Sequence, residues 1–195
     1  TIDDEHEVNE VFLENVRIPA ENVVGEPGKG WDYAKYLLSH ERTGIARIGQ
    51  SRREIRRLKA LAADEPTPAG RLIDDRDFRA KVAEIEIRLT ALELTTLRML
   101  AAITGGAGPG AEANLLKIKG SEIQQDIAEL MMDAVGRYAL AYDAHAWSNG
   151  VHADPIGPAD AAPLAGVYFN TRKVSIYGGS NEIQRNILAK SALGL

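Results

Sequence analysis

The stretch Ala111–Ala134 (AEANLLKIKGSEIQQDIAELMMDA) has the apolar pattern that decides the fold class. Its large apolar residues recur three and four positions apart, which places them on one face of an α-helix. They are Leu115, Leu116, Ile118, Ile123, Ile127, Leu130 and Met131. A face this broad is typical of a helix that packs inside a bundle of other helices.

Helical spacing also occurs on both sides of this stretch. One long helix is predicted from Trp31 to about Ala63, and a second from about Asp75 to Ile103. Segments rich in proline and glycine end them, DEPTPAG after the first and TGGAGPG after the second. A fourth helix is expected to begin near Ala161–Leu164. The chain therefore reads as a series of helices joined by short breaks.

The two ends of the chain carry further signals. Val8–Pro19 (VNEVFLENVRIP) alternates in part between apolar and polar residues, which predicts a strand and a turn. A last short helix is expected to start at Ser180 or Asn181, both common helix caps, and to end at Gly194. The sequence thus predicts a mainly α fold: an antiparallel bundle of four to five helices with a short β lead-in at the N-terminus.

Composition excludes several classes of function. The 195 residues are 45% hydrophobic and 26% charged, as in an ordinary globular protein, and the net charge of -5 argues against a nucleic-acid partner. The absence of cysteine excludes disulfides and thiolate chemistry, and the four histidines do not pair with carboxylates at metal-ligand spacing. No apolar run is long enough to span a membrane, and the acidic N-terminus is no secretory signal, so a cytoplasmic location is expected.

The segment Ile176–Arg185 (IYGGSNEIQR) is the strongest candidate for chemistry. Two glycines allow a ligand to approach the backbone closely, and the N–H groups at the start of the following helix can face a phosphate. The alternative is a plain helix start preceded by a glycine turn. Physical reasoning alone favours this alternative, because such helix starts are common.

Three stretches carry a resemblance that changes this balance. Val174–Leu195 (VSIYGGSNEIQRNILAKSALGL) resembles the closing segment of the flavin-dependent acyl-CoA dehydrogenases. Val11–Gly30 (VFLENVRIPAENVVGEPGKG) looks like the passage from that family's β-domain to its helical domain. Gly30–Gly49 (GWDYAKYLLSHERTGIARIG) is similar to the first long helix of the helical domain. The three stretches occur in the family's order and spacing.

The resemblance implies a domain organisation, a cofactor and partners. Residues 1–29 would be the tail of the β-domain with a connector, and residues 30–195 the C-terminal helical-bundle domain. The cofactor would be FAD, held in the intact enzyme rather than by these residues alone. The partners would be an acyl-CoA substrate, an electron-transfer flavoprotein, and identical or different subunits that assemble through the helical domain.

The implied reaction is the oxidation of an acyl-CoA thioester to its trans-2-enoyl form. A carboxylate removes the α-proton, while the β-hydrogen leaves as hydride to the flavin. Much of the family carries this base directly after the tyrosine of the closing motif, but Gly178 occupies that position here. Other members carry it on the first long helix before an arginine, where this chain has Glu41. The resemblance therefore makes Glu41 the candidate base. Its alternative is a solvated surface carboxylate.

The resemblance also assigns roles to the neighbours of these residues. Arg42 would support the active site, and Tyr177, Gly178 and Gly179 would border the substrate and flavin. Ser180 and Glu182 match positions that contact the adenosine-diphosphate part of FAD.

Two family motifs are missing from this chain. Arg-x-x-Phe-Gly does not occur between Leu58 and Ala83, and Gln-x-x-Gly-Gly is replaced by Met132–Gly136 (MDAVG). Both motifs reach the flavin of a neighbouring subunit. Their loss suggests a catalytic subunit of a heteromeric bacterial enzyme; the alternative is sequence drift in a homotetramer. A non-catalytic flavin-holding subunit and a relative acting on a non-CoA substrate remain as rival functions.

Overall fold

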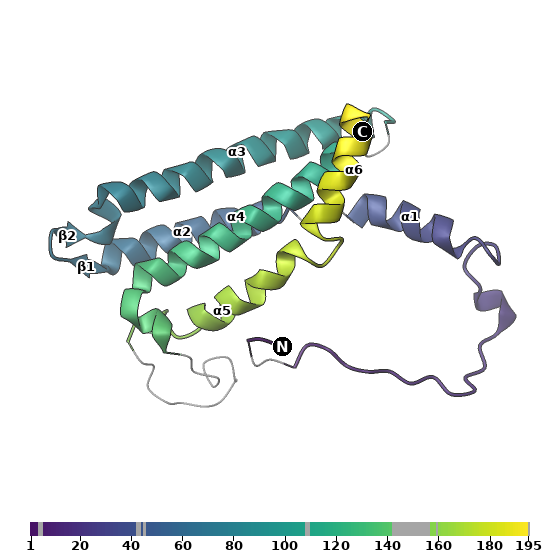
Figure 1. Cartoon of the computed structure of the whole chain (residues 1–195), viewed down its shortest axis with the longest axis horizontal. Helices are drawn as coiled ribbons and strands as arrows, with labels where there is room; N and C mark the ends of the chain where they lie inside the picture. The colour runs from purple at the N-terminus through teal and green to yellow at the C-terminus, as the bar shows by residue number, and fades with distance from the viewer. Residues whose placement is uncertain are drawn as a thin grey trace.

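A computed structural model describes residues 1–3, 6–41, 44, 46–107, 110–141, 157–158 and 160–194. Figure 1 shows several helices packed lengthwise and one long arm that leaves them. The packed part confirms the predicted mainly α bundle.

Helix α4 (Glu112–Val135) lies at the centre of the bundle and contacts α2, α3, α5 and α6. Leu116 and Ile123 are fully buried on it. Burying a side chain of this size contributes roughly 1.5–3 kcal/mol to the stability of the folded chain. The predicted helix Ala111–Ala134 is therefore confirmed, with its ends shifted by one residue.

Helices α2 (Ile48–Asp64) and α3 (Arg76–Thr104) form an antiparallel pair beside α4. A two-stranded hairpin, β1 (Pro66–Thr67) with β2 (Gly70–Arg71), joins them and pairs Pro66 with Arg71. The carboxylate of Asp75 caps α3 by accepting a hydrogen bond of 2.8 Å from the N–H of Phe78. The second helix predicted from about Asp75 to Ile103 is thus confirmed.

Helices α5 (Leu164–Thr171) and α6 (Asn181–Leu193) complete the bundle. A short 3-10 helix, Arg172–Ser175, follows α5 directly. The carbonyl groups of Thr171 and Arg172 accept hydrogen bonds of 3.3 and 3.2 Å from the side-chain amide of Gln125 on α4. This amide therefore ties the segment before the closing motif to the central helix.

The prediction of a single helix from Trp31 to about Ala63 is wrong. The helix is interrupted, and α1 (Gly30–Glu41) and α2 are separate elements. The break is packed tightly against α4. Ala46 is buried, and a Cβ at Gly120 would lie only 2.6 Å from the Cα of Ala46. Arg47 then enters α2 in the left-handed conformation. Apolar spacing alone cannot reveal such a break, because both helices keep an apolar face.

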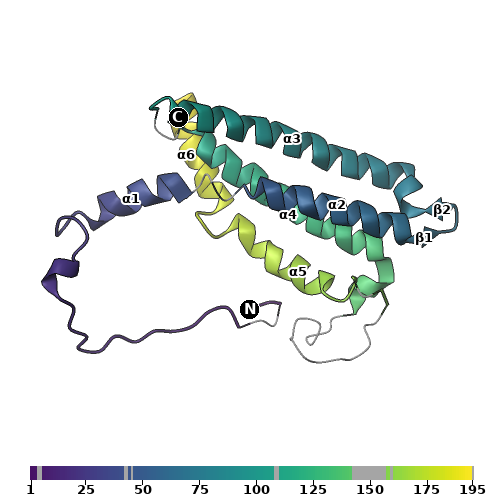
Figure 2. The same cartoon turned by 180° about the vertical axis from the view of Figure 1, so that it is seen from behind.

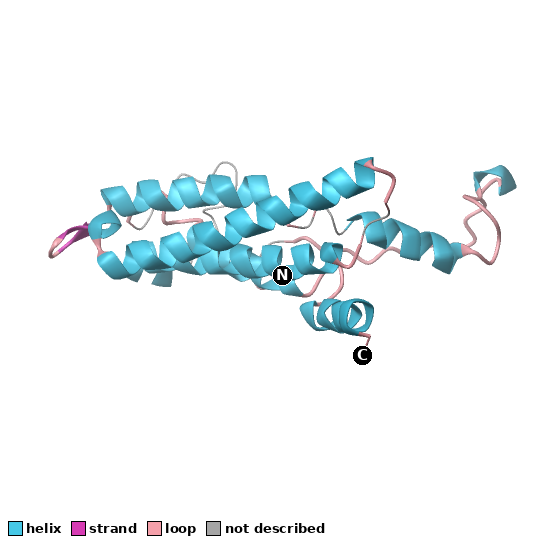
Figure 3. Ribbon diagram, turned by 90° about the horizontal axis from the view of Figure 1, so that it is seen from above, coloured by secondary structure: helices cyan, strands magenta, loops and turns pink. Residues whose placement is uncertain are grey.

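The N-terminal arm, residues 6–41, leaves the bundle and returns along a wide path (Figures 1 and 3). The strand expected over Val8–Pro19 is not formed, because a strand needs a partner for its backbone groups and the described residues offer none there. The two short strands lie instead between α2 and α3. Most large apolar residues of the arm are exposed: Val8, Val11, Phe12, Leu13, Val16, Ile18, Val23, Val24, Trp31, Tyr36 and Leu37.

Candidate active site

The closing motif forms the turn between the 3-10 helix and α6. Its helix starts at Asn181 with Ser180 as the cap, and Gly194 ends it in a left-handed conformation, as predicted. The hydroxyl of Ser180 accepts a hydrogen bond of 3.5 Å from the N–H of Ile183. The N–H of Glu182 faces its own carboxylate, and the N–H of Asn181 has no helical carbonyl to bond. The start of α6 can therefore receive an acceptor.

The glycines of this motif adopt backbone conformations that suit glycine. Gly178 has φ 67° and Gly179 has φ 88°, both in the left-handed region. A Cβ at Gly179 would lie 2.3 Å from Nε2 of Gln184, so the turn lies directly over this side chain. The turn as folded thus favours glycine, and not a carboxylate, at residue 178.

Gln184 is fully buried beneath the turn. Neither its Nε2 nor its Oε1 has a hydrogen-bond partner among the residues that the structure describes. An unpaired buried amide is costly, and each such group in a folded protein calls for an explanation.

Asn181, the first residue of α6, is also buried, and its side chain contacts α4. The ammonium group of Lys117 donates a hydrogen bond of 2.8 Å to Asn181 Oδ1. Asn181 Nδ2 donates to the hydroxyl of Ser121 at 2.9 Å, and that hydroxyl donates to the carbonyl of Ile118 at 2.8 Å. Burial lowers the pKa of Lys117, and the charge of Glu182 opposes this shift.

Glu182 is exposed on the first turn of α6. Its own backbone N–H lowers the pKa of its carboxyl group, and the Ser180 hydroxyl, Arg185 and Lys117 act in the same direction. Arg185 also pairs with Glu122 on α4 at 2.7 Å. Glu182 and Ser180 thus lie together at the start of the helix, where an anionic group interacts favourably with the helix dipole.

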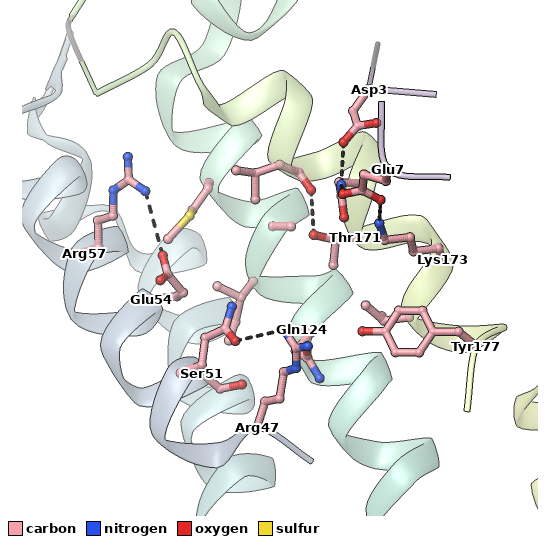
Figure 4. A pocket seen from close by; sticks show the side chains of 17 residues that line it. Asp3, Glu7, Arg47, Ser51, Glu54, Arg57, Gln124, Thr171, Lys173 and Tyr177 are labelled. Atoms are coloured by element: carbon pink, nitrogen blue, oxygen red, sulfur yellow. Dashed lines mark hydrogen bonds and ion pairs between the residues drawn. The ribbon is translucent and has the colours of Figure 1, made fainter. Parts of the chain in front are cut away.

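Tyr177 lines a cavity of about 560 Å³ between α2, α4 and α5. Figure 4 shows its ring on one wall and the buried Ser51 on the α2 side. The lining is mixed in polarity, with Arg47, Glu54, Gln124, Met131 and Val174 among its residues. At the rim, Asn170 and Lys173 pair with Asp3 and Glu7 of the N-terminal segment. The cavity offers both apolar and hydrogen-bonding contacts.

Glu41 is the last residue of α1 and is exposed. Its carboxylate has no hydrogen-bonding partner among the described residues. Figures 1 and 2 place this end of α1 at the same end of the bundle as the start of α6. Arg42 lies outside the described residues. The structure thus brings Tyr177, Gly178, Gly179, Ser180 and Glu182 into one turn, with Glu41 on a separate helix.

Sequence reasoning missed the buried residues beneath this turn: Lys117, Ser121, Asn181 as an anchor, and Gln184. A weak signal existed, because Lys117 lies directly between the apolar residues Leu116 and Ile118. The described part of the chain holds no group of three or more potential metal ligands. Within the same part, no helix is both long and apolar enough to cross a membrane.

A family model for the acyl-CoA dehydrogenase C-terminal domain matches residues 28–193. The chain belongs to the acyl-CoA dehydrogenase family. The match covers both the helical bundle and the closing motif. It confirms the resemblance carried by the closing motif.

Named relatives agree with this assignment. The acyl-CoA dehydrogenase IpdE1 of Mycobacterium tuberculosis is 35% identical over 97% of this chain and 44% of its own length. The long-chain specific mitochondrial acyl-CoA dehydrogenase of Rattus norvegicus is 24% identical over 93% of this chain and 38% of its own length. The chain therefore spans less than half the length of these acyl-CoA dehydrogenases.

A solved structure shows the same fold. The ChsE4-ChsE5 complex from Mycobacterium tuberculosis contains a chain that superposes with a TM-score of 0.73 at 26% identity. The match covers 94% of the present chain and 45% of that chain. That chain and the present one thus share the same helical fold.

Proposed function

We propose that this chain supplies part of the active site of an FAD-dependent acyl-CoA dehydrogenase, which converts an acyl-CoA thioester to a 2-enoyl-CoA. Glu41 is the proposed base. The observation that supports this choice most is the glycine at residue 178, which leaves the position after Tyr177 without a carboxylate. The left-handed backbone of Gly178 favours glycine at this position. Glu41 ends α1 at the same end of the bundle and supplies a carboxylate.

In the proposed reaction, a carboxylate oxygen of Glu41 takes the α-proton of the thioester. The electron pair of that C–H bond becomes the second bond between the α- and β-carbons. Bound FAD would supply the acceptor for the β-hydrogen, which leaves with its electron pair as hydride. Tyr177 and the Gly178–Gly179 turn would border the acyl group and exclude water, which strengthens a carboxylate as a base.

The residues at the start of α6 fit the adenosine-diphosphate part of FAD. Free N–H groups at a helix start bind phosphate oxygens, and the turn formed by Gly178 and Gly179 has no side chain to obstruct them. Ser180 adds a hydroxyl. Glu182 carries a negative charge, but its own N–H, Ser180 and Arg185 stabilise that charge locally. Ser180 and Glu182 are therefore the residues proposed to hold this part of the cofactor.

The exposed surfaces support an assembly around this domain. On α3, Ile87, Leu94 and Leu97 are exposed by 71%, 58% and 57%, a large apolar area for a free surface. The proposed domain boundaries, residues 1–29 and 30–195, place most of the exposed N-terminal arm in a preceding β-domain. We expect oligomerisation through the helical domain, and an electron-transfer flavoprotein as acceptor.

The choice between identical and different subunits rests on the missing motifs. The similarity to a chain of the ChsE4-ChsE5 complex, a complex of two differently named proteins, supports the heteromer. A homotetramer of the full-length protein that is saturated with FAD and active without a second gene product would contradict it.

One observation favours a second candidate function. Glu41 is exposed in this chain, as expected of a surface carboxylate in a subunit that only holds another chain's flavin. A relative acting on a non-CoA substrate would share the same domain. A panel of straight, branched and sterol-derived acyl-CoA thioesters, tested under anaerobic conditions, distinguishes such a relative from an acyl-CoA dehydrogenase. Only the acyl-CoA dehydrogenase would have its flavin reduced by these thioesters.

The decisive variant is Glu41→Gln in the full-length protein. Loss of a general base lowers turnover by about 10²–10⁴-fold, and we expect the bound FAD content to remain unchanged. Glu84→Gln is the matched control, because Glu84 is an exposed helical glutamate on α3, paired only weakly with Arg88 at 3.9 Å. Normal turnover of Glu41→Gln would show that the base lies elsewhere or that this subunit is not catalytic.

The 195 residues alone are expected to hold no tightly bound FAD. Purification of this chain by itself, followed by an absorbance spectrum, tests this expectation. A yellow preparation with one FAD per chain would contradict it.

A further inference from the structure

The start of α6 rests on buried polar side chains from two directions. Lys117 and Ser121 reach it from α4 and bond Asn181, the first residue of the helix. Gln184 reaches it from within α6 and lies under Gly179. These are buried polar residues of the described chain that the proposed reaction does not use.

The burial of Lys117 is hard to explain by stability alone. Its side chain is fully buried, and among the residues that the structure describes its ammonium has one hydrogen-bond acceptor, the neutral amide oxygen of Asn181. Removing a charge from water is costly, and an apolar residue of similar volume is often as stable or more stable in such a position. The contact instead defines the position of Asn181, because a single geometry satisfies the Lys117 ammonium and the Ser121 hydroxyl together.

The charges at this place favour an anion. The buried ammonium of Lys117 lies beside the N-terminal end of α6, where the helix dipole is also positive. Two positive sources at one point repel each other, and a negative group near them offsets this repulsion. Glu182 supplies one negative charge from the surface. A phosphate group bound at the same helix start would supply more.

Gln184 adds an independent observation. Its amide is buried and unpaired among the described residues, directly below the Gly178–Gly179 turn. A buried amide can bond the backbone of that turn once a ligand has set its final geometry. The unpaired groups therefore point to a turn that is completed on binding.

We propose that Lys117, Ser121, Asn181 and Gln184 are positioning residues for the diphosphate of FAD: the first three hold the start of α6 through their hydrogen bonds, and Gln184 supports the Gly178–Gly179 turn by close contact. This inference rests on the proposed function. The four side chains do not touch the reacting atoms. They set the place of the groups that do, and a displacement of about 1 Å in such groups is enough to lower binding or rate strongly.

The test uses Lys117→Met in the full-length protein, together with any subunit that copurifies with it. Methionine keeps most of the buried volume and removes the charge. Lys119→Met is the matched control, because Lys119 lies two residues away on α4 and is exposed. Removing bound FAD and titrating it back should give a Kd at least about tenfold weaker for Lys117→Met, and an unchanged Kd for Lys119→Met.

Two further readouts separate positioning from general stability. Amide hydrogen exchange over residues 177–185 should be faster in Lys117→Met than in Lys119→Met, and the visible spectrum of bound FAD should shift. A lower melting temperature with unchanged exchange, spectrum and Kd would overturn the proposal, because the network would then be purely structural.

Ser121→Ala provides a milder variant should Lys117→Met fail to fold. It leaves the contact between Lys117 and Asn181 in place, so we expect a weaker loss of FAD affinity in the same direction. Where Lys117→Met folds, the double variant should lose less FAD affinity than the sum of the two single losses, because both residues act through Asn181. Additive effects, or an unchanged Kd in Ser121→Ala, would overturn the shared network.

The wild-type protein separates failure of this inference from failure of the proposed function. If wild type binds FAD and oxidises acyl-CoA while Lys117→Met behaves like Lys119→Met, only the positioning role is wrong. If wild type binds no FAD, the proposed function fails and the FAD role of the network fails with it. Hydrogen exchange then still reports whether these side chains hold the start of α6.

Discussion

The bundle and the N-terminal arm use similar apolar residues to opposite effect. In the bundle, Leu58, Leu89 and Leu116 are fully buried between helices. In the arm, Phe12, Trp31 and Leu37 are exposed by 79%, 72% and 56%. The difference shows that apolar content does not by itself create a core; a second surface must face it. The arm has the composition of a segment that packs on another surface, in line with the domain boundaries proposed above.

The largest expected effect tests this comparison with one leucine from each region. Leu116→Ala should destabilise the chain by about 2–5 kcal/mol, because it opens a cavity in the bundle. Leu37→Ala, at an exposed position, should change stability by less than about 0.5 kcal/mol. Urea unfolding of both variants gives the two values. Equal losses of stability in the 195-residue chain would contradict the distinction between the bundle and the arm. A larger loss from Leu37→Ala in the full-length protein would show that the arm is packed there.

The next effect concerns the point where the arm joins the bundle. Gly120→Ala places a methyl group 2.6 Å from the Cα of Ala46, and we expect a loss of about 1–3 kcal/mol through overpacking. Gly49→Ala is the control, because nothing lies within 4 Å of its added Cβ on α2. That control should stabilise the helix by up to about 1 kcal/mol. If both variants behave alike in thermal unfolding, the close approach of Ala46 to α4 is not rigid.

A smaller effect is expected at the start of α6. Ser180→Ala removes the helix cap and should cost about 0.5–1 kcal/mol, the low end for a cap because its hydrogen bond is long at 3.5 Å. Ser191→Ala in the same helix is the comparison, since its hydroxyl bonds the carbonyls of Ile187 and Leu188 within the helix and caps no free N–H group. Chemical unfolding and hydrogen exchange of α6 measure both. Equal effects would argue against Ser180 as the cap.

The smallest effect is a pH dependence at Lys117. Burial lowers the pKa of Lys117 in the folded chain, so the unfolded chain binds more protons between that value and the ordinary lysine pKa. Stability should therefore rise with pH across this alkaline window. The stability difference between wild type and Lys117→Met, followed from neutral to alkaline pH, isolates the contribution. If the stability of wild type relative to Lys117→Met instead fell as the pH rises, the ammonium of Lys117 would be stabilised in the folded state.

Much of the helical fold could be predicted from spacing, caps and breaks. Asp75, Ser180 and Gly194 are local signals, since each acts on backbone groups only a few residues away. The break before α2 could not be predicted, because it depends on contact with Gly120 more than seventy residues along the chain. The strand expected over Val8–Pro19 failed for a related reason: a strand forms only where a partner is present.

The candidate site divides in the same way. The sequence by itself determined the family motif, the absence of a carboxylate at Gly178 and the choice of Glu41 as candidate base, because these depend on residue identity and order. Only the tertiary structure decided that Gly178 is left-handed, that Gln184 lies under Gly179, and that Lys117 holds Asn181. Those facts are contacts between helices or conformations of a packed turn, and the free energy that selects them arises only when α4 and α6 come together.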